Sequence, residues 1–330
     1  MKEKESRQFT AWRSNSSAFV KSENLTLVIA LIIMVAIFSF SNKNYFTTRN
    51  LINILTSASL TGLVCIGESM LLIGGMMDLS AGATAAFSGV AAGLLLQAGV
   101  PMPATFLLVL LCGAFIGCCN SFFITRLHIN AFIVTLAMQS VVRGFGYIIS
   151  DGKGIMIANP QFLKMGTAKL FNSSFLTFPI IVLVFMFIVF FVALKRTRFG
   201  REIYIVGGNS NAARLAGISP EKTTWLLFII TGLLAALGGM VLAARMNAAQ
   251  PQACDNLEFD AITAAILGGI AMSGGYGSLS GAFIGLFILQ GFNNGLIMMN
   301  VQSFWQNVAK GVLLLLALSF DYFRSRKRRG

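Results

Sequence analysis

Three polar side chains at helical spacing are the clearest sign of chemistry in this sequence. Thr135, Gln139 and Arg143 lie four residues apart inside an otherwise apolar segment, so in a helix they share one face. A hydroxyl, an amide and a guanidinium on one face present hydrogen-bond donors suited to the hydroxyl groups of a solute. We therefore expect this face to line a pathway for a polar solute.

A second group of polar residues lies within or near the apolar segments of the C-terminal part. Polar groups in lipid are costly, so they either join helices by hydrogen bonds or line a route for a solute. A single amide is more often a link between helices, whereas the set as a whole favours a pathway. The candidate pathway residues of this part are Gln290, Asn293, Asn294, Gln306 and Lys310.

The other reactive residues form no recognisable catalytic or metal site. His128 is the only histidine, and it has no cluster of cysteines or carboxylates at metal-ligand spacing, so a surface position explains it better than a ligand role. The five cysteines lack metal-ligand spacing. No glycine-rich loop ends in the Gly-Lys-Ser or Gly-Lys-Thr of a phosphate site. We expect a chain that is not an enzyme and holds no metal or cofactor.

The composition indicates a chain that crosses a membrane many times. Of its 330 residues, 56% are hydrophobic and only 11% are charged, and the mean hydropathy is +0.76. So few charges cannot cover a globule in water, and lipid offers no hydrogen bonds to an open backbone, so the spans must be helices. We expect an all-α polytopic membrane protein with about ten transmembrane helices, at 25–41, 51–74, 80–98, 104–126, 130–149, 175–194, 223–244, 259–274, 279–299 and 303–321.

The basic residues predict the orientation. With the N-terminus inside, seventeen Lys and Arg residues fall on the cytoplasmic side and six on the other, as the positive-inside rule requires. Both ends are then cytoplasmic, with 1–24 as an N-terminal segment, 25–321 as the transmembrane domain and 322–330 as a basic tail. No basic face with interleaved aromatic residues accompanies the net charge of +13, which argues against nucleic-acid binding.

One carboxylate stands at the start of the third apolar segment, in the stretch GGMMDLSAG. Counting segments places Asp78 in a cytoplasmic turn at 75–79, where Asp78 or Ser80 would cap the third helix. If the flanking helices are shorter, Gly74-Gly75 instead breaks the chain inside the bilayer, and the freed amides serve the pathway.

The two halves of the chain resemble each other weakly. Asp260 opens the eighth segment as Asp78 opens the third, each followed by small residues, and Arg143 and Lys310 each precede a glycine in the fifth and tenth segments. An offset of five spans would insert the halves in opposite orientation, which is the layout of inverted-repeat transporters. A 5+5 inverted repeat is therefore possible.

Two longer polar stretches interrupt the spans. Residues 150–174 have the glycine, proline and asparagine of a folded external loop. Residues 195–222 fall inside, and there Asn209 or Ser210 is a helix start, helix formers follow, and Gly217 is a stop. We predict a short cytoplasmic helix in this second stretch.

Four ordered motifs resemble the permease subunits of ribose-type ABC importers, including the autoinducer-2 importer permeases. The resemblance covers nearly the whole chain, from about residue 25 to 320. One departure is the pair Met76-Met77, where the family commonly has a single residue between Gly-Gly and Asp. The motifs are GGMMDLSAGA (74–83), NAFIVTLAM (130–138), TRFGREIYIVGGNSNAARLAGI (197–218) and FDAITAAILGGIAMSGGYGSLSGAFIGLFILQGFNNGL (259–296).

The resemblance implies an assembly in the bacterial cytoplasmic (inner) membrane. Two permease copies, identical or related, would bind two ATPase subunits that hold ATP and Mg, and an extracytoplasmic sugar-binding protein would deliver a monosaccharide or similar solute. The stretch 195–222 then corresponds to the segment that docks on the ATPase. Its docking residues are Asn209, Ser210, Asn211, Ala212, Ala213, Arg214, Leu215, Ala216 and Gly217.

Two other functions compete with this expectation. A secondary transporter driven by an ion gradient is suggested by Glu68 and Asp78, which are possible ion sites. A membrane enzyme or receptor is suggested only by the polar face, and it lacks a nucleophile, a base or a metal set. An ABC importer permease is the leading hypothesis.

Overall fold

The fold is a bundle of helices, seen in a computed structural model that describes residues 25–169 and 176–329. The expected segments 1–24 and, in part, 150–174 and 322–330 lie outside the described residues. Each of the ten apolar segments contains a helix. These are Leu25–Ser41, α2 (Thr48–Ile73), α3 (Ala81–Gln97), α4 (Met102–Arg126), α5 (Ala131–Ile149), α7 (Phe178–Arg196), α10 (Pro220–Met246), α11 (Leu257–Leu267), α12 (Leu279–Met298) and α13 (Ser303–Arg329).

The helices differ in length. Among the described residues, seven are long and apolar enough to cross a membrane, while Leu25–Ser41 and α3 are shorter. Helix α11 has only 11 residues, or about 16 Å at the α-helical rise, which is roughly half the thickness of the hydrocarbon layer. Helix α11 alone is therefore too short to cross the hydrocarbon layer.

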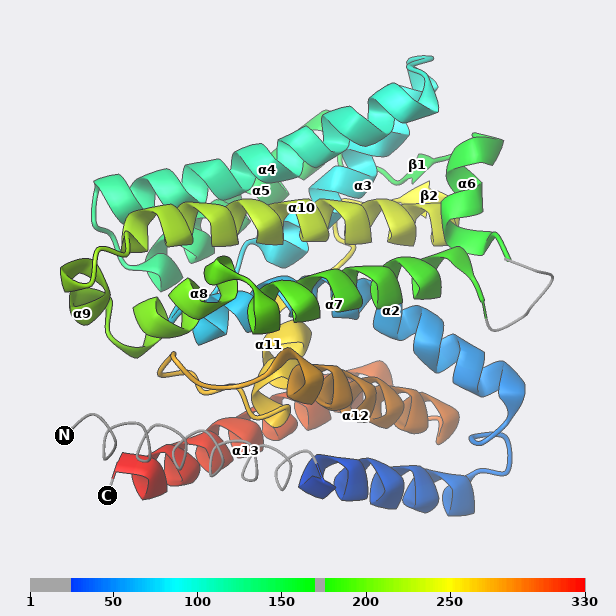
Figure 1. Ribbon diagram of the computed structural model, residues 1–330. Coiled ribbons are helices and arrows are strands. Elements are labelled where there is room, and N and C mark those ends of the chain that lie inside the picture. Colours follow the sequence, from blue (N-terminus) through cyan, green and yellow to red (C-terminus); the bar gives the residue numbers. More distant parts are fainter. Residues whose placement is uncertain (1–24, 170–175, 330) are drawn as a thin grey trace, which may run out of the picture.

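The two polar stretches contain small elements of their own. The stretch 150–174 carries β1 (Ile155–Met156) and α6 (Pro160–Thr167), and β1 pairs antiparallel with β2 (Ala248–Ala249). The second stretch carries α8 (Arg198–Gly208) and α9 (Ser210–Leu215), so the predicted short helix is confirmed. Helices α8 and α9 lie at the opposite end of the bundle from α6 and the strands (Figure 1).

Helix α10 lies at the centre of the bundle and packs on α4, α3 and α2. A Cβ atom added at Gly113 of α4 would overlap the Gly232 carbonyl of α10, and one added at Gly117 would overlap the Phe228 carbonyl. Small residues at this spacing let two backbones touch directly. By contrast, α5, α7 and α13 expose many large apolar side chains, as expected of a surface in lipid.

The packing of the two halves follows one plan. Helices α2, α3, α4 and α5 of the first half correspond to α10, α11, α12 and α13 of the second. The contact between α10 and α4 has its counterpart in the contact between α2 and α12. Likewise, α3 contacts α10 and α5, and α11 contacts α2 and α13. Helices α2 and α10 run in opposite directions in Figure 1. In agreement, Met76 just after α2 contacts Thr224 near the start of α10, and Arg245 at the end of α10 contacts Ser57 near the start of α2. This arrangement agrees with an inverted repeat.

The chain is interrupted at two related places. Residues 74–80 between α2 and α3, and 268–278 between α11 and α12, are turns or irregular. The two interruptions meet, because the Gly275 amide donates to the Ile73 carbonyl at 2.7 Å. Both interruptions are packed against other backbone, since a Cβ atom added at Gly274 would lie 2.9 Å from the Cα atom of Gly75.

Candidate functional site

A group of polar side chains is buried at the start of α3. The Asp78 amide donates to Glu68 Oε2 at 3.2 Å, and Asp78 Oδ1 accepts from the Ser80 amide at 2.8 Å and the Ser80 hydroxyl at 2.5 Å. Asn120 Nδ2 of α4 donates to the Ser80 hydroxyl at 2.9 Å and to Asp78 Oδ1 at 3.4 Å. Glu68, Ser80 and Asn120 are fully buried, and Asp78 is 3% exposed.

The turn expected between the second and third helices is present at 74–80, but Asp78 within it is buried. Glu68 lies five residues before the end of α2, which is about 7.5 Å along the helix axis, and the Asp78 amide donates to it. After Gly75, the chain therefore turns back along α2 before α3 begins. Asp78 Oδ1 accepts from the amide of Ser80, the residue that precedes α3. The Ser80 hydroxyl makes no capping hydrogen bond to α3.

The predicted face of α5 meets the segment that leads into α11. Gln139 Nε2 donates to Glu258 Oε1 at 2.8 Å. Arg143 Nη1 donates to the carbonyls of Pro251 at 2.9 Å and Ala253 at 2.7 Å. Thr135 is fully buried, but its hydroxyl bonds to carbonyls of its own helix. Two of the three side chains thus tie α5 to this segment.

Glu258 is the functional candidate that sequence reasoning missed. It is fully buried near the start of α11, and a Cβ atom added at Gly82 in the first turn of α3 would overlap its Oε2 atom. Gly82 is one helical turn beyond Asp78, so the two polar groups adjoin at the start of α3. The available signal was a second acid in the stretch LEFDAITAA, where only Asp260 had been considered.

Four buried polar atoms of this region have no hydrogen-bond partner among the described residues. They are Glu68 Oε1, Asn120 Oδ1, Glu258 Oε2 and Arg143 Nη2. Buried polar atoms are almost always paired, and an unpaired one requires an explanation such as a water molecule or a ligand. Arg143 Nη2 already forms an ion pair with Asp255 Oδ1 at 3.8 Å, so the region offers chiefly the three oxygen atoms as acceptors to a polar solute or to water.

The other predicted pathway residues lie in two further places. Lys310 of α13 forms an ion pair with Asp260 of α11 at 2.8 Å, while Gln306 bonds to the Val301 carbonyl just before its own helix. The amides of α12 face α2, where Gln290 donates to Thr61 at 2.9 Å and Asn294 exchanges two hydrogen bonds with Asn50. Asn293 lies on the same helix and is half-buried.

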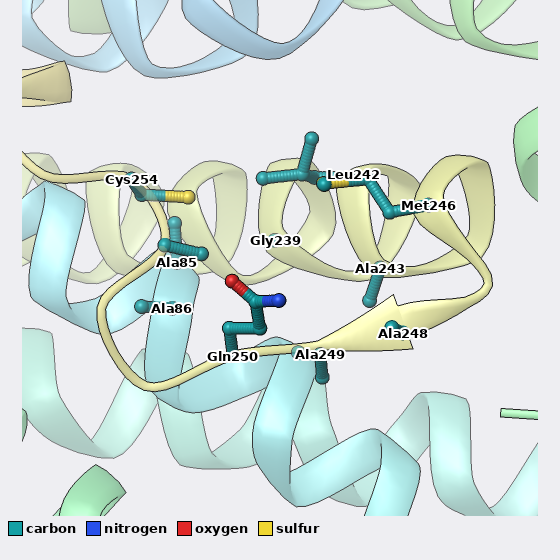
Figure 2. A pocket seen from close by; sticks show the side chains of 12 residues that line it. Ala85, Ala86, Gly239, Leu242, Ala243, Met246, Ala248, Ala249, Gln250 and Cys254 are labelled. Atoms are coloured by element: carbon teal, nitrogen blue, oxygen red, sulfur yellow. The ribbon is translucent and has the colours of Figure 1, made fainter. Parts of the chain in front are cut away.

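The cavity beside this region is too small for a sugar. It has a volume of about 20 Å³ and lies between α3 and α10, and a space of that size holds about one water molecule. Figure 2 shows the Gln250 side chain entering it beside Ala85, Ala86 and Gly239. A larger hollow of about 810 Å³ opens where α4 ends and α10 begins, and Arg126, His128, Glu221, Lys222 and Trp225 are among its lining residues.

The candidate docking helix α9 projects from the bundle. Asn209 caps it by accepting the Ala212 amide at 3.0 Å, and Gly217 beyond its end has a φ of 79°, as its start and stop signals predict. Leu215 is 91% exposed, and Arg214 pairs with Glu221 at 2.7 Å. An apolar side chain so exposed at the tip of a polar helix is a natural contact for a partner.

Helix α8 connects α9 to the bundle. Asn209 ends α8 and also caps α9, so no linker separates the two helices. Tyr204 Oη donates to the Gly277 carbonyl at 2.9 Å, and desolvation by burial raises the pKa of Tyr204 to about 12. Tyr204 therefore stays protonated and keeps its donor at physiological pH.

Comparison with known proteins gives the same picture over nearly the whole chain. Residues 50–318 match the family described as "Branched-chain amino acid transport system / permease component". The L-arabinose ABC transporter permease protein of Azospirillum brasilense is 34% identical over 92% of this chain and 88% of its own length. The ribose import permease protein of Bacillus subtilis strain 168 is 35% identical over 90% and 92%.

Solved structures show a looser likeness. A structure described as an inward-facing conformation of a metal-chelate type ABC transporter aligns with 93% of this chain and 99% of its own, with 12% identity and a TM-score of 0.49.

Proposed function

This chain belongs to the family of branched-chain amino acid transport system / permease components, and on that premise we propose that it is the membrane subunit of an ATP-driven importer for a monosaccharide or a similar polar solute. The observation that carries the proposal is the similarity, over at least 90% of the chain, to permeases named for L-arabinose and ribose. The chain itself is a multi-pass helical membrane protein and a transport subunit.

We propose three kinds of partner for it. Two ATPase subunits bind ATP and Mg and dock on residues 209–217, a second permease copy completes the membrane part, and an extracytoplasmic sugar-binding protein delivers the solute. The exposed tip of α9 and its direct connection to α8 support the docking site. The ion-gradient alternative retains the buried Glu68 and Asp78 as its motivation, but the named relatives favour the ATP-driven importer.

The route would run beside α5 and α13. The cavity between α3 and α10 is too small for a sugar, whereas α5 and α13 carry the fifth and tenth spans and face outward over much of their surface. A second copy placed against these helices would enclose a route between the subunits. Alternating access would then bring Gln139, Arg143 and Lys310 into contact with the solute, and their hydrogen-bonding groups suit hydroxyls.

Uptake by proteoliposomes tests the proposal. The chain and its ATPase are reconstituted into vesicles. ATP is supplied on the side that the ATPase faces, and the binding protein with radiolabelled ribose or L-arabinose is supplied on the opposite side. We expect uptake of a sugar that requires ATP and stops when the ATPase is omitted. Uptake that persists on a membrane potential or ion gradient without the ATPase would refute an ATP-driven importer and favour a secondary transporter.

A further inference from the structure

Three glycine-containing segments from distant parts of the sequence meet at one point, which we call the glycine junction. They are the end of α2 at Ile73–Gly75, the end of α8 at Gly207, and the loop at Gly274–Gly275. A Cβ atom added at Gly207 would overlap the Ile73 carbonyl oxygen and lie 2.8 Å from the Gly275 nitrogen. One added at Gly274 would lie 2.6 Å from the Gly207 carbonyl oxygen and 2.9 Å from the Cα atom of Gly75.

These contacts leave no room for a side chain. Real Cβ atoms essentially never approach another heavy atom closer than 3.0 Å, and here the neighbours are backbone atoms that cannot swing aside. A methyl group at Gly207 would therefore push α8 away from α2 and from the loop. The junction is a direct backbone contact between the cytoplasmic helix and two interrupted membrane segments.

A second contact holds the same helix to the same loop. Tyr204 lies one turn before Gly207 on α8, and its hydroxyl donates to the Gly277 carbonyl at 2.9 Å. Ile203 and Val206 on α8 are buried, so the helix is seated on the bundle. Helix α8 thus contacts the loop at two points one turn apart, and a rotation or shift of α8 must move the loop.

Both segments at the junction lead to the buried carboxylates. Ile73–Gly75 lies between Glu68 on α2 and Asp78 before α3, and the Asp78 amide is bonded to Glu68. The loop at Gly274–Gly275 follows α11, the helix that carries Glu258. At the junction, α8 therefore contacts both segments that lead to the buried carboxylates, Ile73–Gly75 and Gly274–Gly275.

We propose that Gly207 is a positioning residue. Through it, a movement of α9 changes the positions of the two interrupted segments and of the buried polar side chains that they carry. The proposal rests on the proposed function, because α9 moves only if a partner docks on it. Gly207 touches no solute. Its role is to keep α8 close enough to Ile73 and Gly275 for a displacement of α9 to shift both segments together.

The test compares neighbouring glycines. Gly207→Ala places a methyl group inside the junction, whereas Gly208→Ala points its methyl group into open space, with nothing within 4 Å. The chain is assembled with its ATPase and binding protein in proteoliposomes, and sugar imported and ATP hydrolysed are measured in the same vesicles. We expect Gly208→Ala to keep the wild-type ratio of sugar to ATP, and Gly207→Ala to lower it by about tenfold, within the range of typical coupling effects.

If Gly207 only stabilised the structure, Gly207→Ala would reduce the amount of assembled complex but leave the ratio of sugar imported to ATP hydrolysed unchanged. A wild-type ratio in an assembled Gly207→Ala complex, or equal losses of uptake and hydrolysis, would overturn the proposal. If Gly207→Ala fails to assemble, Tyr204→Phe decides, because it removes only one hydrogen bond to the same loop. We expect a smaller fall in the ratio for Tyr204→Phe, and an unchanged ratio would overturn the proposal.

A fluorescent label on the loop separates this proposal from the sugar assignment. Met272 is partly exposed, and after the five free cysteines are replaced by alanine, a label at Met272→Cys reports the loop directly, whatever solute is carried. We expect ATP to change the signal in wild-type and Gly208→Ala complexes but not in Gly207→Ala. If the wild type imports no sugar but the fluorescence follows this pattern, the proposal that the solute is a sugar is refuted and the proposed role of the junction is supported. An equal response in all three would refute the junction alone.

Discussion

The hydrogen bond between Gln139 and Glu258 should contribute more to stability than the amide pairs that join other helices. Glu258 is fully buried, its Oε1 atom accepts from Gln139 Nε2 at 2.8 Å, and its Oε2 atom has no partner among the described residues. Gln139→Met keeps a side chain of similar size but removes the donor. The buried carboxylate then loses its side-chain hydrogen-bond donor, Gln139.

The expected loss follows from the type of bond. At about pH 9, where Glu258 is in its carboxylate form, a hydrogen bond to this charged group contributes about 1.5–3 kcal/mol. Gln139 is only half-buried, so about 1.5 kcal/mol is the expected cost in free energy of unfolding at that pH. Asn294→Leu is the matched control, since it breaks a neutral amide pair with Asn50. Hydrogen bonds between membrane helices average about 0.6 kcal/mol, so the control should lose about that amount for each bond.

Reversible unfolding of the purified chain in mixed micelles measures both losses. The background variant Glu258→Gln removes the charge, and Gln139→Met added to it should cost only about 0.6 kcal/mol, the value for a neutral pair. Asn294→Leu breaks two bonds, so a loss for Gln139→Met no greater than half of the loss for Asn294→Leu would refute the reasoning. The same cost with and without the charge at Glu258 would refute it as well.

Three further outcomes are expected. Gly113→Val should lower the free energy of unfolding by about 1–3 kcal/mol through overpacking against α10, whereas Gly144→Val, with open space at its Cβ position, should change it little; equal losses would contradict the close contact. Asn209→Ala should cost α9 about 1 kcal/mol of capping energy and weaken cross-linking of Leu215→Cys to the ATPase; undiminished cross-linking would contradict the need for this cap. Burial raises the pKa of Tyr204 from 10.0 to about 12, so as the pH rises the unfolded chain loses this proton before the folded chain does. The free energy of unfolding should therefore fall between pH 10 and pH 12 in the wild type, and it should fall less in Tyr204→Phe. Identical pH profiles for the two proteins would contradict the shift.

Local signals in the sequence were enough to locate the ten apolar helices and α9, but not α6 or α8. Apolar length gives each of the ten segments, and a cap at Asn209 with a stop at Gly217 gives α9, because these signals act over a few residues. The five-span offset also agrees with the helix contacts. Such features depend on neighbouring residues, so a single sequence contains the information.

Features that depend on distant contacts were not predictable in the same way. The depth of Asp78 follows from its bond to Glu68, and that contact exists only because the chain turns back after Gly75. Glu258 was passed over for Asp260 because spacing alone cannot tell which acid faces α3 and which faces Lys310. The roles proposed for the pathway and docking residues stay predictions.

The bond between the Gly275 amide and the Ile73 carbonyl has a consequence for biosynthesis. Ile73 ends α2, yet the partner of its carbonyl is made only after the ribosome has completed helices α3 to α11. Until then this carbonyl must bond to water or another temporary donor, since a buried carbonyl without a partner is costly. The end of α2 therefore stays hydrated during synthesis, and a chain released before Gly275 would keep water at the place where α8 and the loop later pack.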